Sequence, residues 1–153
     1  MEKTQVMRIL DKNKIEYNTY NYEGVISGID VAEFLGINKD QMFKTLVTIS
    51  NTNNIYVFLV SVNDELDLKK GAIIVNEKSL SMIPSKDLLK TTGYIHGGCS
   101  PIGMKKKFRT TIDKKAESFK TIFFSAGKIG FSVEVSLDNL SKVIDFTIAD
   151  ITK

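Results

Sequence analysis

Apolar residues recur every three or four positions in five stretches of the chain, which is the spacing of a helix with one buried face. Thr4 precedes the first stretch and can cap its N-terminus. Gly36 and Gly93 follow two others, and glycine often ends a helix because it adopts the left-handed conformation at low cost. The pattern therefore predicts helices over residues 4–13, 27–36, 66–75, 84–93 and 137–144.

Other stretches are rich in β-branched and aromatic residues or alternate apolar with polar positions, as strands do. The polar turn 51–54 joins two of them into an expected hairpin. Because strands dominate and helices are scattered among them, we expect one α+β domain over residues 1–153, with antiparallel neighbours and no βαβ repeat. Strands are predicted over 15–22, 42–50, 54–61, 108–113, 121–126 and 131–136, and a strand or extended tail over 145–151.

Composition is that of a globular protein able to bury a core, with 42% hydrophobic and 25% charged residues in 153. The longest apolar run, 55–60, is too short to span a bilayer, and residues 1–14 lack the apolar stretch of a signal peptide. The single cysteine, Cys99, cannot form an internal disulfide. We therefore expect a cytoplasmic protein without a membrane segment.

The supply of metal ligands is small. A structural zinc site needs about four nitrogen or sulfur ligands, and this chain has one histidine and one cysteine. No pattern of carboxylates stands out either. We expect neither a metal nor a cofactor.

Positive charge is concentrated in the middle of the chain. The segment Lys86–Lys128 has ten Lys or Arg against three Asp or Glu, or +7, whereas the whole chain carries +3 and the remainder therefore −4. Such asymmetry favours one face that binds a polyanion. A solvated lysine-rich surface would give the same pattern.

Lys44 and Tyr22 are candidate pocket residues. Lys44 lies early in the apolar strand 42–50; it is either exposed at the strand end or placed at a pocket rim, where its ammonium can hold an anionic or carbonyl oxygen. Tyr22 ends the predicted strand 15–22. It is either an amphipathic strand residue or a pocket wall with a hydroxyl available for hydrogen bonding.

Residues 93–103 hold four of the ten glycines and one of the two prolines. Consecutive backbone N–H groups at Gly97, Gly98, Cys99 and Ser100 can form a cradle for a developing oxyanion. Ser100 adds a hydroxyl, and Pro101 stiffens the turn. This segment is therefore a candidate site for a reacting carbonyl oxygen.

Four cations follow this loop and suit a phosphate backbone: Lys105, Lys106, Lys107 and Arg109. A loop that holds a carbonyl oxygen beside cations that hold a polyanion describes an ester at the end of a nucleic acid. A Cys99–His96 nucleophile pair is disfavoured because no acid nearby orients the histidine. We instead expect His96 on a strand and Cys99 as a small buried residue.

At these residues the sequence resembles the YbaK-type aminoacyl-tRNA deacylases, relatives of the editing domain of bacterial prolyl-tRNA synthetases. The resemblance covers nearly the whole chain, and its order and spacing are those of the family. The matching segments are FKTLV (43–47), LDLKK (66–70), TGYIHGGCSPIGMKK (92–106), TTID (110–113) and SAGKIG (125–130).

The resemblance implies a mixed, largely antiparallel sheet, curved or barrel-like, with flanking helices. It implies that the substrate is a mischarged tRNA, namely tRNA(Pro) esterified with cysteine, and that prolyl-tRNA synthetase is a transient partner. The substrate's own thiol would attack its carbonyl and release a thiolactone. The implied catalytic residues are Lys44, Gly97, Gly98 and Ser100. The implied substrate-binding residues are Tyr22, Phe43, Cys99, Pro101, Ser125 and Ser132.

One position departs from the family pattern: Ser132 stands where the family has an acid, while Glu134 is kept. If that acid positions the substrate's amino group, activity or specificity differs here. Two alternatives therefore stay open. One is a deacylase of the same class for another amino acid, such as alanine, and the other is a non-catalytic tRNA-binding module.

Overall fold

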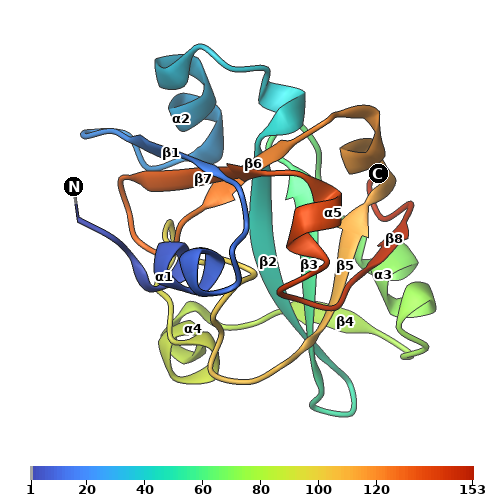
Figure 1. Ribbon diagram of the computed structural model, residues 1–153. Coiled ribbons are helices and arrows are strands. Elements are labelled where there is room, and N and C mark those ends of the chain that lie inside the picture. Colours follow the sequence, from blue (N-terminus) through green and yellow to red (C-terminus); the bar gives the residue numbers. More distant parts are fainter. Residues whose placement is uncertain (1) are drawn as a thin grey trace.

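The computed structural model describes residues 2–153, which form two sheets and flanking helices (Figure 1). Three strands pair in the order β1-β7-β6 and five in the order β4-β2-β3-β5-β8. The strands are β1 (Asn18–Asn21), β2 (Phe43–Ser50), β3 (Ile55–Ser61), β4 (Leu80–Met82), β5 (Arg109–Asp113), β6 (Ile122–Ser125), β7 (Phe131–Val135) and β8 (Thr147–Ala149). The helices are α1 (Gln5–Lys12), α2 (Gly28–Leu35), α3 (Leu68–Ile74), α4 (Ser85–Thr92) and α5 (Leu137–Leu140), with 3-10 turns η1 (Lys39–Gln41) and η2 (Lys114–Ser118).

The pairing is mixed and largely antiparallel. The predicted hairpin is β2–β3, with Phe43 opposite Ser61 and Ile49 opposite Ile55. The pairs β1–β7, β2–β4 and β6–β7 are also antiparallel, whereas β3–β5 and β5–β8 are parallel. The α+β prediction is therefore confirmed.

The two sheets meet where β2 begins. Met42 makes an isolated parallel bridge to Phe123, and both side chains are buried in one apolar cluster with Val31 of α2. Figure 1 shows β6 and β7 crossing the upper end of β2, with α2 above them and α1 and α4 below. This junction places the start of β2 against elements of both sheets.

Helix ends follow the sequence signals. The Thr4 side chain accepts a hydrogen bond from the Met7 backbone N–H at 3.3 Å. Gly36 (φ 69°) and Gly93 (φ 89°) are the left-handed residues that end α2 and α4. Capping supplies partners for backbone groups that a helix terminus otherwise leaves unpaired.

Two local predictions were wrong, and one strand was missed. The short strand β4 was not foreseen, and α5 ends at Leu140 instead of continuing to residue 144. His96 lies in a turn and not on a strand, because Gly97 takes a left-handed φ of 85° and Gly98 donates back to the Ile95 carbonyl. The chain therefore reverses where a strand was expected.

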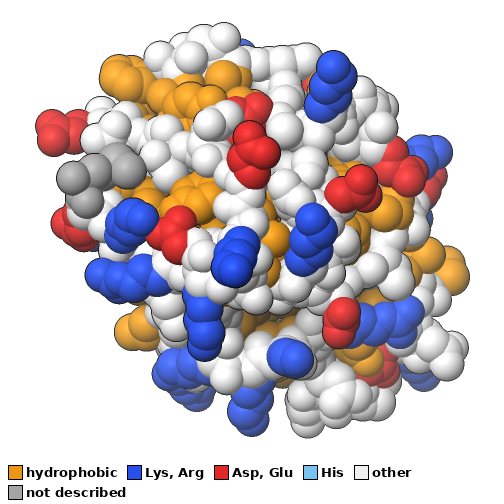
Figure 2. Space-filling model, in the orientation of Figure 1, with side chains coloured by type: hydrophobic (Ala, Val, Ile, Leu, Met, Phe, Trp, Pro, Cys, Tyr) orange, Lys and Arg blue, Asp and Glu red, His pale blue; other side chains and the backbone are white. Residues whose placement is uncertain are grey.

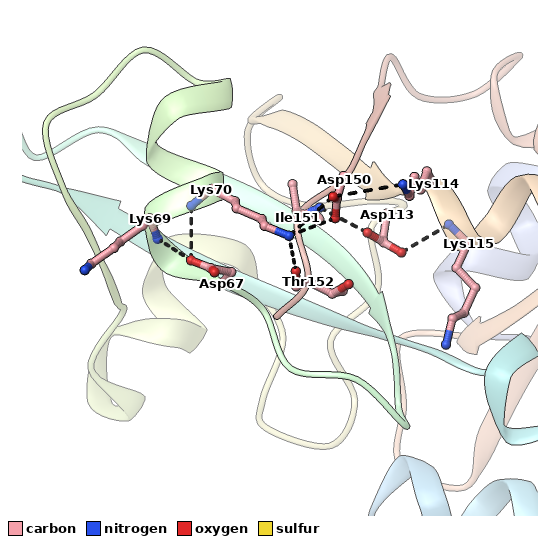
Figure 3. A network of polar contacts seen from close by, with 9 residues as sticks. All are labelled: Asp67, Lys69, Lys70, Asp113, Lys114, Lys115, Asp150, Ile151 and Thr152. Carbon is pink, nitrogen blue, oxygen red and sulfur yellow. Dashed lines mark hydrogen bonds and ion pairs between the residues drawn. The ribbon is translucent and has the colours of Figure 1, made fainter.

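A buried carboxylate fixes β8 beside β5 (Figure 3). Asp113, 2% exposed, accepts hydrogen bonds from the backbone N–H groups of Lys115 and Ile151, each at 3.1 Å. From α3, the Lys70 ammonium donates to the Thr152 carbonyl at 2.7 Å. The Asp113 carboxylate and the Thr152 carbonyl would lose these hydrogen bonds if the segment after α5 moved, which is costly for a buried acceptor such as Asp113. The network therefore holds that segment in position.

The tip of the β2–β3 hairpin is tied to the end of α3 by Glu77. Its carboxylate accepts from the Tyr56 hydroxyl at 2.7 Å, from Thr52 Oγ1 at 2.9 Å and from Asn54 Nδ2 at 3.2 Å. These hydrogen bonds, that of Tyr56 foremost, lower the pKa of Glu77 from 4.5 to about 2. Charged Glu77 is therefore favoured in the folded state.

We expect Glu77→Gln to lower the free energy of unfolding at neutral pH. Because the folded-state pKa is depressed, the contribution of the charged group is present above pH 4.5 and is lost as the pH falls to about 2. Urea unfolding of the variant and the parent between pH 2 and 7 measures this. The difference should close at the acid end, whereas Glu117→Gln, at an exposed position, should show none.

Candidate functional site

A cavity of about 690 Å³ lies at the junction of the two sheets. Its walls come from the first half of β2, the start of α2, the start of α4, the turn after α4, and β6 and β7. Most of the lining is apolar, with a few polar groups, as is usual for small-molecule sites. The polar lining side chains include Tyr22, Lys44, Thr45, Ser125 and Ser132.

Lys44 places its half-buried side chain at this cavity from β2, where its backbone pairs with Val60. It is the one Lys or Arg of the cavity lining within residues 2–153, and its ammonium has no hydrogen-bond or ion-pair partner there. An unpaired ammonium in an apolar cavity interacts more strongly with an anion than it would in water. Lys44 can therefore hold a negatively charged or polarised oxygen.

Tyr22 and Ser132 form a polar pair on another wall. Their hydroxyl oxygens are 2.8 Å apart, and Ser132 is 1% exposed. Burial raises the pKa of the Tyr22 hydroxyl, and the hydrogen bond with Ser132 partly opposes this shift. The phenol therefore stays protonated at neutral pH and is a neutral hydrogen-bonding group.

The glycine-rich loop contributes less backbone to the cavity than the sequence predicts. Gly97 and Cys99 line it, whereas Gly98, Ser100 and Pro101 do not. The Gly98 N–H is already donated to Ile95 at 3.0 Å, and Ser100 is fully buried, accepting a hydrogen bond from the Ile102 N–H at 3.4 Å. Gly98 and Ser100 therefore make hydrogen bonds within the loop instead of lining the cavity.

Two positions, 97 and 127, require glycine because a neighbouring side chain lies directly against the backbone there. A Cβ on Gly97 would lie 2.9 Å from the Ile26 side chain, which also lines the cavity. A Cβ on Gly127 would lie 2.9 Å from the ring of Tyr94, whose hydroxyl donates to the Ile102 carbonyl. Tyr94 thus fastens the 97–103 loop to the turn between β6 and β7.

Cys99 is 9% exposed, as its expected role of a small buried residue requires. Burial raises the pKa of its thiol to about 12, and a hydrogen bond with Thr92 opposes this only in part. A cysteine nucleophile reacts as the thiolate. At neutral pH Cys99 is therefore a protonated thiol and a poor nucleophile.

Of the predicted site residues, seven line the cavity: Tyr22, Phe43, Lys44, Gly97, Cys99, Ser125 and Ser132. Thr45 was missed, although its buried Oγ1 has no partner among the described residues and it also lines the cavity. Thr45 directly follows Lys44 on β2, and nothing in the surrounding sequence marks it as a site residue. Only the unpaired hydroxyl, visible in the structure, marks it.

The predicted phosphate-binding cations lie elsewhere. Lys106, Lys107 and Arg109 line a second groove, while the Lys105 ammonium reaches the Lys90 carbonyl at 3.4 Å. Figure 2 shows Lys and Arg side chains gathered over α1, α4 and the segment that leads from α4 to β5. The predicted phosphate-binding cations therefore lie on a surface outside the cavity, and their role in binding RNA stays a prediction.

Residues 24–143 match the model of the aminoacyl-tRNA editing domain family. The chain belongs to this family. The match confirms the predicted family. Within residues 2–153 the editing domain has no helix long and apolar enough to cross a bilayer. No group of three or more potential metal-ligand side chains is found in the same residues.

The editing domain is also similar to named proteins. EbsC of Enterococcus faecalis carries the provisional name Cys-tRNA(Pro)/Cys-tRNA(Cys) deacylase. It is 42% identical over an alignment 154 residues long, which covers 99% of this chain and 94% of EbsC. The proline–tRNA ligase of Fervidobacterium nodosum is 34% identical over 76 residues, which are 50% of this chain but 13% of the ligase.

Two crystal structures share the fold. The hypothetical protein APE2540 superposes with a TM-score of 0.90 at 16% identity, covering 98% of this chain and 100% of that one. A protein provisionally described as a trans-editing enzyme for prolyl tRNA synthetase gives 0.85 at 19% identity, covering 99% of each chain. At these identities the likeness is evidence for the fold alone.

Proposed function

We propose that this editing domain is a trans-acting deacylase that removes cysteine from mischarged tRNA(Pro). The observation that carries the proposal is the unpaired Lys44 ammonium in a largely apolar cavity whose one thiol, that of Cys99, is protonated at neutral pH. The name of EbsC, similar over nearly its whole length, supports cysteine as the cargo. The partial match to a proline–tRNA ligase supports tRNA(Pro).

In the proposed reaction the nucleophile comes with the substrate. The cysteinyl sulfur attacks its own ester carbonyl, the bond to the ribose oxygen breaks, and the thiol proton ends on that oxygen. The products are a cyclic thiolactone and tRNA with an intact terminal hydroxyl. The domain supplies shape and orientation, which hold the thiol in position to attack the carbonyl, while Lys44 stabilises the carbonyl oxygen as it gains charge.

Two uncharged hydroxyl groups of the cavity, those of Tyr22 and Ser132, are proposed to orient the substrate's amino acid. Ser132 replaces an acid of the family pattern, and here it pairs with Tyr22 instead. Selection of tRNA(Pro) is proposed to involve prolyl-tRNA synthetase, because one domain of this size offers few contacts to a distant anticodon.

The test is deacylation of a panel of charged tRNAs. We expect Cys-tRNA(Pro) to be cleaved fastest, Ala-tRNA(Pro) more slowly and Pro-tRNA(Pro) hardly at all. A methyl-sized difference is worth only about 1–3 kcal/mol, so the discrimination against alanine must come from the missing thiol. Faster cleavage of the alanyl ester would contradict the cysteine assignment, and tRNA binding without cleavage of any ester would contradict deacylation.

A further inference from the structure

A second groove of about 660 Å³ lies on the other side of the loop that borders the cavity. One wall is formed by residues 101–110, which lead into β5, and the other by residues 141–147, which lead from α5 into β8. Pairing of Thr111 with Thr147 and the Asp113 carboxylate hold these walls together (Figure 3). The groove is therefore a fixed feature of the fold.

The groove is strongly positive. Within the described residues its lining contains four cations, Lys106, Lys107, Arg109 and Lys142, against one acid, Asp145. Lys106 and Lys107 are exposed and have no hydrogen-bond or ion-pair partner in residues 2–153.

The other two cations donate to uncharged oxygens. Arg109 donates to the Ile74 carbonyl at 3.0 Å, and Lys142 donates to Asn139 at 3.1 Å. Neither contact neutralises charge, so the groove attracts anions.

Aromatic rings line the same groove. Phe108 and Phe146, one from each wall, are half-buried, and both pack on the main core. Rings anchored in this way beside cations that can follow a phosphate backbone are the combination that binds unpaired nucleotides, because bases stack on aromatic faces. In Figure 2, blue side chains surround a hollow with orange walls between α5 and the segment that leads from α4 to β5.

The groove lies close to the cavity along the chain. Cys99 lines the cavity and Pro101 lines the groove. Two residues span at most about 7 Å of chain, so the two sites share a thin wall. A strand with its terminal ester in the cavity and its preceding nucleotides in the groove would pass around the segment 99–101, which borders both sites.

We infer that this groove binds the unpaired nucleotides of the tRNA that precede the aminoacylated end, with phosphates on Lys106 and Lys107 and bases against the aromatic walls. The inference rests on the proposed function for the identity of the RNA. It extends that function to a second site, and it assigns Lys105, whose ammonium reaches the Lys90 carbonyl, no part in that site.

The test compares Lys106→Glu/Lys107→Glu with the matched control Lys69→Glu/Lys120→Glu, a pair of exposed lysines outside both the groove and the cavity. Fluorescence anisotropy follows binding of uncharged tRNA(Pro) and of a short single-stranded RNA ending in CCA at several salt concentrations. The groove variant should bind about tenfold or more weakly and reduce the salt slope by about 1 to 2, since fewer counterions are released. The control should bind as the parent does.

Deacylation separates the two proposals. For an active parent we expect the groove variant to raise KM and leave kcat within about threefold, because the groove is outside the cavity. A parent that cleaves no ester while the groove variant still loses RNA affinity would overturn the proposed function alone. Unchanged RNA affinity and salt slope in a folded groove variant would overturn the groove, as would loss of binding to prolyl-tRNA synthetase without loss of RNA binding.

Discussion

Lys44→Ala is expected to lower the rate of deacylation about 100- to 1,000-fold, the usual cost of removing one contact to a developing oxyanion. The ammonium lines the cavity without a partner among the described residues, so a substrate oxygen can be its main partner. The loss should appear mostly in kcat, because the contact strengthens as the carbonyl oxygen gains charge. Single-turnover deacylation of Cys-tRNA(Pro) measures it.

Two controls accompany this variant. Lys44→Met keeps most of the aliphatic side chain and removes the charge, so it should be as inactive as the alanine variant. Lys120→Ala removes an exposed lysine outside the cavity and should be fully active. Both Lys44 variants should unfold at the parent's temperature or above it, since no ion pair is lost. A Lys44→Ala enzyme within threefold of the parent would remove this residue from the mechanism.

The second large effect concerns the source of the nucleophile. Cys99→Ala should keep deacylation of Cys-tRNA(Pro) within a few-fold of the parent, because its thiol has a pKa of about 12 and no role in the proposed chemistry. The parent should cleave Ser-tRNA(Pro) on the order of 100-fold more slowly than the cysteinyl ester, since a hydroxyl is a far weaker nucleophile than a thiol. Both rates come from the same single-turnover assay.

The two measurements are interpreted together. Cys99→Ser keeps the size of the buried side chain and controls for a packing defect in the alanine variant. A folded but inactive pair of Cys99 variants, with brisk cleavage of the seryl ester, would place the nucleophile on the protein. Slow cleavage of the seryl ester with an active Cys99→Ala enzyme is the outcome that substrate chemistry requires.

Local signals in the sequence predicted much of the fold. Thr4, Gly36 and Gly93 mark helix ends because the groups that cap a helix are few and local. The hairpin over 42–61 follows from two β-rich runs around a polar turn. Strand β4 has three residues and pairs with a strand far along the chain, so tertiary contacts decide it rather than its own pattern.

The candidate site was predictable only as far as motifs reach. The resemblance points to Lys44, Gly97 and Ser132, and all three line one cavity. It could not show that Ser100 turns into the core, since that depends on the left-handed turn at Gly97. Nor could it place Lys106 in a separate groove, because that groove forms only when tertiary packing brings residues 101–110 and 141–147 together.

Burial of Cys99 also has a consequence for redox chemistry. Its thiol lines a cavity proposed to receive another thiol, that of the substrate, and disulfide exchange requires a thiolate. Because burial raises the pKa of this thiol to about 12, Cys99 is protonated at pH 7. Formation of a mixed disulfide with cystine or oxidised glutathione is therefore disfavoured at Cys99.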